Sequence, residues 1–208
     1  INILYNWEIF EMGELDGKVA IITGAGRLRG IGRAAAEALA KLGADVVVTG
    51  TGRNPDTFPD DEKAIGWNDI ETVAERVRDL GRRALPLVVD VTNRDDVKRM
   101  VDETIKEFGR VDILINNAGI LRDKSFKKMS LEEWDLVIDV HLNGTAYVTH
   151  AAWPIMNEQK YGRIVLTSSG SGIYGNFGQA NYGAAKMGML GLMNVLALEG
   201  GRNNVRVN

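Results

Sequence analysis

The sequence predicts a single-domain α/β protein built on a doubly wound parallel sheet, with helices on both faces. From Lys18 onward, short β-branched runs alternate with longer segments of helical period, the pattern of repeated strand-helix-strand units. The short runs are almost wholly apolar, as expected of strands that helices cover on both sides. At 208 residues the chain is long enough for one hydrophobic core and too short for two.

Each element follows from a local pattern. Strands are predicted at residues 19–23, 46–49, 85–89, 111–115 and 164–167, and a sixth begins at Val205. Helices are predicted at residues 33–42, 70–80, 97–108, 131–158 and 182–199. The fourth helix carries a core-facing stripe at helical spacing, formed by Trp134, Val137, Ile138, His141 and Leu142. Residues 54–69 break the alternation with two prolines and several acids, and are interpreted as an inserted loop.

Composition excludes several classes of function. Charged residues make up 25% of the chain and the net charge is -3, so neither nucleic acid nor an anionic membrane is expected as a partner. Cysteine is absent, which excludes disulfides, a thiolate nucleophile and a zinc-thiolate site. No metal site is predicted, and the cytoplasm is the expected location. No apolar stretch approaches the ~20 residues of a membrane span.

One domain is predicted to occupy residues 13–208, after an N-terminal extension at residues 1–12. The sixth strand starts just before Asn208. The region that follows this strand in similar architectures, including a substrate-binding loop, is therefore expected to lie outside the sequence.

A glycine-rich turn between the first strand and the first helix predicts a phosphate-binding site. Glycine lets the backbone approach a pyrophosphate, and the N-terminus of the following helix attracts the anion. Glycine clusters also occur in ordinary turns, but the strand-turn-helix context favours a dinucleotide. Cofactor contacts are predicted here for Gly24, Arg27, Gly30, Ile31 and Gly32.

The end of the second strand indicates which dinucleotide is bound. An acid there usually bonds the ribose hydroxyls of NAD, whereas arginine accommodates the 2'-phosphate of NADP. Here the strand ends in Thr49-Gly50-Thr51-Gly52-Arg53, without an acid. NADP is therefore favoured over NAD, with Arg53 as the phosphate ligand. Two alternatives stay open: Arg53 is an ordinary surface charge, or the insert brings Asp56 inward.

Two more segments end strands at the same edge of the sheet. After the third strand, the carboxylate of Asp90 is placed to bond the adenine amine. After the fourth, asparagine amides can tie neighbouring strand ends together, and small residues admit a ribose. Either segment is alternatively only a turn. The predicted cofactor contacts are Asp90, Val91, Asn117, Ala118 and Gly119.

Tyr182 and Lys186 are predicted to act together, because residues four apart share one face of a helix. A free phenol titrates near ~10, so acid–base work near neutral pH requires stabilisation of its anion, which a neighbouring ammonium provides. Ser169 ends the fifth strand, where its hydroxyl would hold a substrate oxygen while Tyr182 exchanges a proton and a nicotinamide exchanges a hydride. For the pair alone, an ordinary surface tyrosine beside a surface lysine is the alternative.

Together these motifs resemble the short-chain dehydrogenase/reductase superfamily of the classical type. The matching residues occur in the family's order: Thr23-Gly24 with Gly30-Ile31-Gly32, Asn116-Asn117-Ala118-Gly119, Ser169, Tyr182 and Lys186. The resemblance implies a Rossmann-type sheet, an NAD(P) site to which Tyr182 and Lys186 contribute, and a Ser-Tyr-Lys catalytic group. It also implies a homodimer or homotetramer packed through the fourth and fifth helices. That packing and ordinary helix-on-sheet contact are both compatible with the small residues Gly183, Ala184, Gly188 and Gly191.

Two departures from the family pattern stand out. The glycine turn is longer than usual, so Leu28 and Arg29 are expected to bulge. His141 takes the place of an asparagine that extends a proton relay in many members. It is predicted to serve the same relay, and the alternative is a core histidine bonded to a backbone carbonyl.

His141 and the segments 119–126 and 171–179 also resemble the dehydrogenase unit of peroxisomal multifunctional enzymes. This implies a 3-hydroxyacyl or 3-oxoacyl thioester as substrate. The predicted function is thus NAD(P)-dependent interconversion of a secondary alcohol and a ketone. The alternatives are a nicotinamide-nucleotide sensor without turnover and a dehydrogenase of steroids, sugars or small alcohols. A sugar-nucleotide epimerase and a methyltransferase fit the motifs less well.

Overall fold

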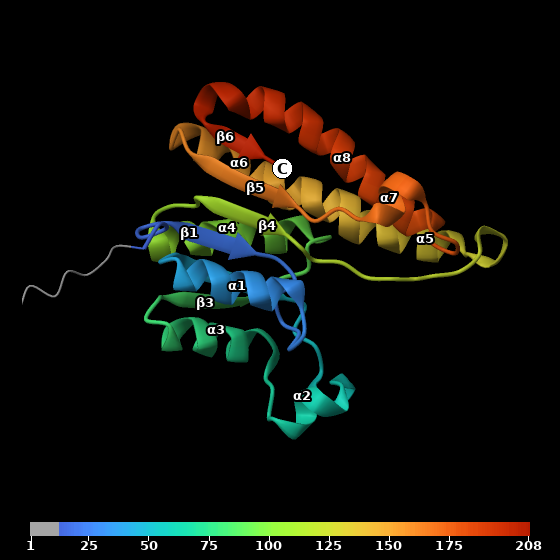
Figure 1. Cartoon of the computed structure of the whole chain (residues 1–208), viewed down its shortest axis with the longest axis horizontal. Helices are drawn as coiled ribbons and strands as arrows, with labels where there is room; N and C mark the ends of the chain where they lie inside the picture. The colour runs from blue at the N-terminus through green and yellow to red at the C-terminus, as the bar shows by residue number, and fades with distance from the viewer. Residues whose placement is uncertain (1–12) are drawn as a thin grey trace, which may run out of the picture.

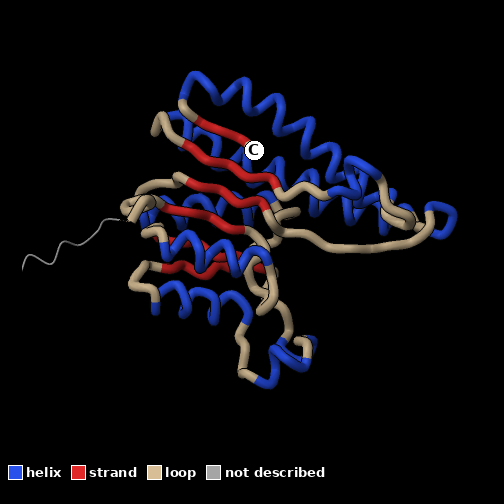
Figure 2. Tube along the Cα trace, viewed as in Figure 1, coloured by secondary structure: helices blue, strands red, loops and turns tan. Residues whose placement is uncertain are grey.

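The computed structural model describes residues 13–208, and the predicted extension at residues 1–12 lies outside them. The structure contains a six-stranded sheet in the order β3-β2-β1-β4-β5-β6, with every neighbouring pair parallel (Figures 1 and 2). The predicted doubly wound α/β fold is confirmed. The strands are β1 Val19–Ile22, β2 Asp45–Gly50, β3 Ala84–Val88, β4 Ile113–Asn116, β5 Gly162–Leu166 and β6 Val205–Val207.

Helices cover the sheet from both sides because successive strand residues point to opposite faces. Ile22 and Val48 pack with residues of α1 (Ile31–Lys41) and α3 (Asp69–Asp79) on one face. Ile21 and Val47 pack on the other face, in the cluster that includes α4 (Arg94–Phe108), α6 (Gly144–Glu158) and α8 (Ala180–Gly200). Within residues 13–208 no helix is long and apolar enough to cross a membrane.

The predicted fourth helix is one continuous helical segment, but its middle is wider than expected. It consists of α5 (Leu131–Ile138), a π-helical turn at Asp139–Asn143, and α6. Of the predicted stripe, Val137 and His141 are buried, whereas Trp134, Ile138 and Leu142 are half-buried. A π-turn adds a residue to the helical repeat and often occurs at functional sites. Here it carries His141.

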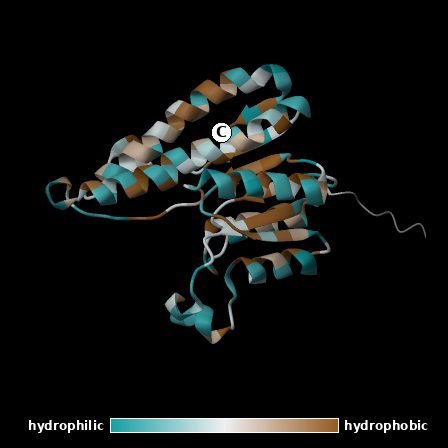
Figure 3. Ribbon diagram, turned by 180° about the vertical axis from the view of Figure 1, so that it is seen from behind, coloured by the Kyte–Doolittle hydropathy of each residue, from teal (hydrophilic) through white to brown (hydrophobic). Residues whose placement is uncertain are grey.

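The insert at residues 54–69 is not the plain loop that the sequence predicted. It forms a 3-10 turn at Pro55–Thr57 and a short helix, α2 (Asp60–Ala64). Asn54 caps the first of these by accepting a hydrogen bond from the backbone of Asp56, and three acids occupy the first turn of α2, where a helix N-terminus stabilises negative charge. Figure 1 shows α2 projecting from the sheet, and Figure 3 shows it in largely hydrophilic colours.

A buried carboxylate joins β1 to the start of β4. Asp112, whose side chain is fully buried, accepts a hydrogen bond from the backbone N–H of Val19 at 3.0 Å. The guanidinium of Arg110 donates to both of its oxygens, at 2.6 and 2.7 Å. A buried carboxylate is tolerated because these donors replace the water that it loses.

We expect Asp112→Ala to lower the free energy of unfolding by about 1–3 kcal/mol, because it leaves the buried backbone N–H of Val19 without its hydrogen-bond acceptor. Urea unfolding followed by circular dichroism measures the loss. Glu107→Ala is the control: its carboxylate is half exposed and lies 3.9 Å from Arg83, so a change within about 0.5 kcal/mol is expected. Equal losses in the two variants would contradict this role of Asp112.

Candidate active site

A cleft of about 460 Å³ opens at the carboxyl ends of the strands. It lies where the strand order reverses, between β1 and β4, the position at which open α/β sheets bind ligands. Figure 2 shows the loops that gather at this end of the sheet. Most residues predicted to contact the cofactor line the cleft, namely Gly24, Arg27, Gly30, Ile31, Arg53, Asp90, Val91, Asn117, Ala118 and Gly119.

Two glycines of the turn are required by close backbone contacts. Gly24 has a φ of +67°, and a Cβ atom there would lie 2.6 Å from the Cα of Ala118. Gly32 does not line the cleft but lies behind it, where a Cβ atom would come within 2.7 Å of the amide nitrogen of Asn117. The turn therefore packs directly on the end of β4, and its residues Gly24, Gly26 and Arg27 line the cleft, where a dinucleotide phosphate site is expected.

Asn117 ties β4 to β1, as the sequence predicted for this segment. Its side-chain amide donates to the backbone carbonyls of Thr23 and Gly24, each at 2.9 Å. In return, the hydroxyl of Thr23 accepts from the backbone N–H groups of Asn117 and Ala118, at 3.0 and 3.1 Å. Asn116 points away from this pair and donates to Thr149 on α6 at 3.0 Å.

The other residues predicted to contact the cofactor differ in whether their side chains are already bonded within the chain. Arg27 and Ile31 are exposed at the cleft. The carboxylate of Asp90 accepts hydrogen bonds from the backbone N–H and the hydroxyl of Thr92, at 2.9 and 2.8 Å. Asp90 therefore forms the turn that was the alternative interpretation, and it also lines the cleft. Asp56 is exposed and does not line the cleft.

Leu28 and Arg29 form the expected bulge, which is closed by a hydrogen bond from the backbone N–H of Gly30 to the carbonyl of Arg27. Two acids that the sequence did not single out, Glu62 and Asp69, contact Arg53 instead of a ligand. No local pattern marks them, because they reach Arg53 only through the fold of the insert.

Three of the predicted catalytic residues, His141, Tyr182 and Lys186, lie close together beside the cleft rather than in its lining. The ring centroids of His141 and Tyr182 lie 5.0 Å apart at an angle of 90°, and the ammonium of Lys186 lies 5.6 Å from the centroid of the Tyr182 ring. Ser169 begins the short helix α7 (Gly170–Tyr174), where its hydroxyl accepts from the N–H of Ser171 at 3.2 Å. Helix α7 packs against α8, with Gly172 against Lys186.

Lys186 is only 3% exposed, and its ammonium donates to the carbonyl of Thr167. Burial lowers the pKa of Lys186 from 10.5 to about 8, because a buried site disfavours the charged form. The group is still mostly charged at pH 7. It can therefore stabilise a neighbouring phenolate by its positive charge.

His141 is 3% exposed and its Nε2 atom lies 2.7 Å from the carbonyl oxygen of Ile120. Burial is the main cause that lowers its pKa from 6.5 to about 4, and the charge of Lys186 acts in the same direction. The ring is therefore neutral at pH 7. Nε2 contacts both the carbonyl oxygen and the backbone N–H of Ile120, at 2.7 and 3.0 Å, whereas the buried Nδ1 has no partner among residues 13–208. The contact with a backbone carbonyl that the core interpretation expected is present, and the relay role stays a prediction.

Asn181 was not given a role from the sequence, although it precedes Tyr182 directly. It is fully buried, and its amide donates to the backbone carbonyls of Arg122 and Glu133, at 3.3 and 3.1 Å. Its side-chain oxygen accepts from the N–H of Tyr182 at 2.7 Å. Asn181 thus anchors the first turn of α8, and with it Tyr182, to α5 and the loop before it.

The sequence model of the family described as short chain dehydrogenase matches residues 18–208. The chain belongs to the short-chain dehydrogenase family. It is 51% identical over 193 residues to peroxisomal multifunctional enzyme type 2 of Drosophila melanogaster, an alignment that covers 93% of the chain and 31% of that protein. It is 39% identical over 194 residues to a 3-oxoacyl-(acyl-carrier-protein) reductase of Thermotoga maritima, covering 93% of the chain and 72% of that protein.

Solved structures agree with this membership. NAD+-bound xylitol dehydrogenase superposes with a TM-score of 0.83 at 31% identity, covering 94% of the chain and 69% of that structure. The family model and this superposition agree on a short-chain dehydrogenase fold. It spans about a third of the length of the Drosophila relative.

We expect His141 to make stability fall in acid. Its pKa is about 4 in the folded protein against 6.5 when exposed, so the unfolded state binds the proton first as the pH falls through 6.5, and the stabilisation is lost progressively down to about pH 4. Between pH 7 and pH 5 this removes about 2 kcal/mol. The measurement is urea unfolding of the wild type, His141→Asn and His150→Asn at both pH values.

Only His141→Asn should lose this part of the pH dependence, because His150 is exposed on α6. A pH dependence that is the same in all three proteins would show that His141 does not titrate as its burial indicates.

Proposed function

We propose that this family member interconverts a secondary alcohol and a ketone with Ser169, Tyr182 and Lys186 as the catalytic group. A nicotinamide bound in the cleft supplies the acceptor or donor of the hydride. In the oxidative direction the phenolate oxygen of Tyr182 takes the proton of the substrate hydroxyl. The hydroxyl of Ser169 forms a hydrogen bond with the substrate oxygen at the same time. The ammonium of Lys186 stabilises the phenolate. The observation that carries the proposal is that the Tyr182 ring packs against His141 and lies 5.6 Å from the ammonium of Lys186, beside the cleft.

The proposed cofactor contacts are the cleft-lining residues of the turn and strand ends, and the turn fits such a group. Its glycines occupy positions that a Cβ atom would fill. Two features at the end of β2 bear on the nucleotide. An arginine at this position favours NADP, as the sequence predicted. The ion pairs of Arg53 with Glu62 and Asp69 favour NAD instead, because they occupy its guanidinium.

As substrate we propose a 3-hydroxyacyl thioester or its 3-oxoacyl counterpart. The support is the likeness to a peroxisomal multifunctional enzyme and to a 3-oxoacyl-(acyl-carrier-protein) reductase. The alternative, a steroid, sugar or small-alcohol dehydrogenase, has the likeness to xylitol dehydrogenase in its favour. A cytoplasmic location stays a prediction, beside relatives whose names place them in the peroxisome.

We further propose that the chain forms a homodimer or homotetramer through the outer side of α8. Gly183 and Gly188 pack inside the chain. A Cβ atom added to Gly183 would lie 3.0 Å from the carbonyl oxygen of Ser171, and one added to Gly188 would lie 3.0 Å from the side chain of Leu142. Gly191 instead faces open space. Large apolar side chains flank it on the same helix, with Val195 53% and Leu198 83% exposed. A second copy would shield this apolar surface from water.

Tyr182→Phe should lower kcat about 10²–10⁴-fold, because it removes the acid–base group, and should leave NADH and NADPH binding intact. The assay is reduction of acetoacetyl-CoA with each cofactor, with a steroid ketone and a sugar ketone in parallel. Tyr161→Phe is the matched control, since Tyr161 stacks on Lys18 and Arg163 away from the cleft.

Undiminished turnover by Tyr182→Phe would disprove the catalytic assignment. Turnover of the steroid or sugar ketone alone would disprove the thioester assignment. Dinucleotide binding without turnover of any substrate by the wild type would favour the sensor.

Substituting Val195 and Leu198 together by glutamate should convert the oligomer into monomers, because two charges per copy would be buried in the contact. Light scattering after gel filtration gives the mass. The control is Leu80→Glu, at the end of α3, which should leave the oligomer unchanged. A wild type that is monomeric at micromolar concentration would refute the proposal.

A further inference from the structure

The insert contacts the phosphate turn and the end of β2 at the same time. The carboxylate of Glu62 accepts one hydrogen bond from the backbone N–H of Leu28 and one from the guanidinium of Arg53, each at 2.9 Å. The indole N–H of Trp67 donates to the carbonyl of Gly26 at 2.7 Å. Glu62 and Trp67 are buried, so water does not compete for these contacts. The insert is thus built into the wall of the cofactor site.

Arg53 is held by the insert rather than free to meet a ligand. Besides its bond to Glu62, its guanidinium donates to the carbonyl of Gly26 at 3.0 Å and lies 3.4 Å from the carboxylate of Asp69. It stacks on the ring of Phe58 at 4.5 Å, and its side chain is only 17% exposed. A 2'-phosphate would have to displace a carboxylate to reach it.

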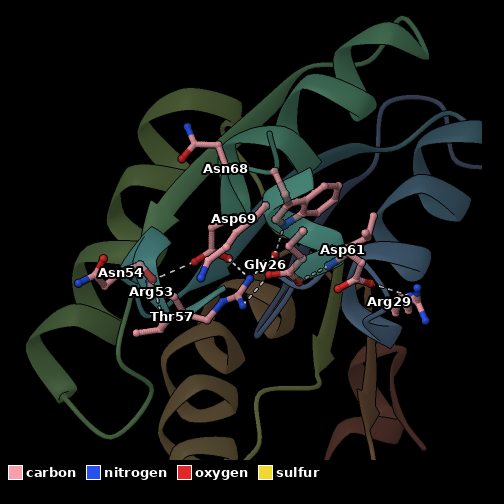
Figure 4. Close-up of polar contacts among 12 residues, drawn as sticks. Gly26, Arg29, Arg53, Asn54, Thr57, Asp61, Asn68 and Asp69 are labelled. Atoms are coloured by element: carbon pink, nitrogen blue, oxygen red, sulfur yellow. Dashed lines mark hydrogen bonds and ion pairs between the residues drawn. The ribbon is translucent and has the colours of Figure 1, made fainter. Parts of the chain in front are cut away.

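Asp69 brings a carboxylate to the edge where β2 itself has none. Its backbone is left-handed, with a φ of +50°. A Cβ atom added to Gly26 would lie only 1.4 Å from one of its carboxylate oxygens, so Asp69 packs directly on this glycine. Its other oxygen accepts from the backbone N–H of Arg53 at 3.1 Å. Asp69 lines the cleft beside Gly50 and Thr51. Figure 4 shows Asp69 and Arg53 converging on Gly26.

A third acid of the insert pairs with an arginine of the phosphate turn. Asp61 lies 2.9 Å from Arg29, at the surface. Around Arg53, one guanidinium faces two carboxylates, which leaves the end of β2 with a net negative charge. Arg27 stays exposed at the cleft, where it is available to the pyrophosphate.

We infer that the insert makes the cleft selective for NAD. The carboxylate of Asp69 accepts hydrogen bonds from the hydroxyls of the adenosine ribose, and the charges of Asp69 and Glu62 exclude a 2'-phosphate. The inference rests on the proposed function and reverses the preference for NADP that Arg53 predicts in the sequence. A phosphate monoester carries about -1.5 to -2 charges at neutral pH. Its repulsion by buried carboxylates is only weakly screened by salt.

Titrations with NADH and with NADPH, followed by nicotinamide fluorescence, test the inference without requiring turnover. The wild type should bind NADH at least about tenfold more tightly than NADPH. Asp69→Asn should shift the ratio of the two Kd values at least about tenfold towards NADPH, since asparagine tolerates the left-handed backbone but carries no charge. Adding Arg53→Gln to this variant should abolish the gain, because Arg53 then supplies the phosphate contact.

Glu62→Gln is a second route to the same result. Its Oε1 atom can still accept from Leu28, but its amide no longer pairs with Arg53, so the ratio of the two Kd values should shift several-fold towards NADPH. Glu71→Gln removes one charge from an exposed position in the first turn of α3 and should alter neither Kd.

Tighter binding of NADPH than of NADH by the wild type, or an unchanged ratio in both Asp69→Asn and Glu62→Gln, would overturn the inference and leave the proposed function standing. Binding of neither dinucleotide by the wild type would overturn both.

Discussion

The hydrogen bonds between Thr23 and Asn117 are the constraint on which the site depends. They join the carboxyl ends of β1 and β4, the two strands between which the order of the sheet reverses. The chain leaves these strands towards opposite faces, so a crevice opens between the loops. Because the amide of Asn117 also holds the carbonyl of Gly24, the same contact sets the shape of the phosphate turn.

The two halves of the site differ in their exposure to water, and their chemistry differs accordingly. The cleft is open along the turn and Arg27 is exposed at it, which suits a large charged cofactor. Beside it Lys186 and His141 are buried, so the pKa of Lys186 falls towards neutrality and His141 is kept uncharged. The π-turn matters here because it places His141 against Ile120 and the ring of Tyr182. A regular helix would carry this side chain to a different angle.

The insert shows how a surface addition can reach the chemistry of a fold. It projects from the sheet at α2, yet its buried residues Glu62 and Trp67 return to the phosphate turn. The turn is longer than the family pattern, and its extra residue Leu28 is the one whose N–H binds Glu62. The added turn and the insert therefore form one polar cluster with Arg53. Its electrostatic character cannot be assigned from any single residue in it.

Periodicity and turn chemistry are local properties, and from them the sequence by itself determined the strands, the main helices, the glycine turn and the helical pairing of Tyr182 with Lys186. The mixed helical structure of the insert and the π-turn were not predicted, because short helices and an added residue in a helical repeat leave little periodic signal. Only the tertiary structure decided what binds Arg53 and His141. Asp69 lies 16 residues from Arg53, and Ile120 lies 21 from His141. Contacts over such separations depend on how the chain packs, which local spacing does not encode.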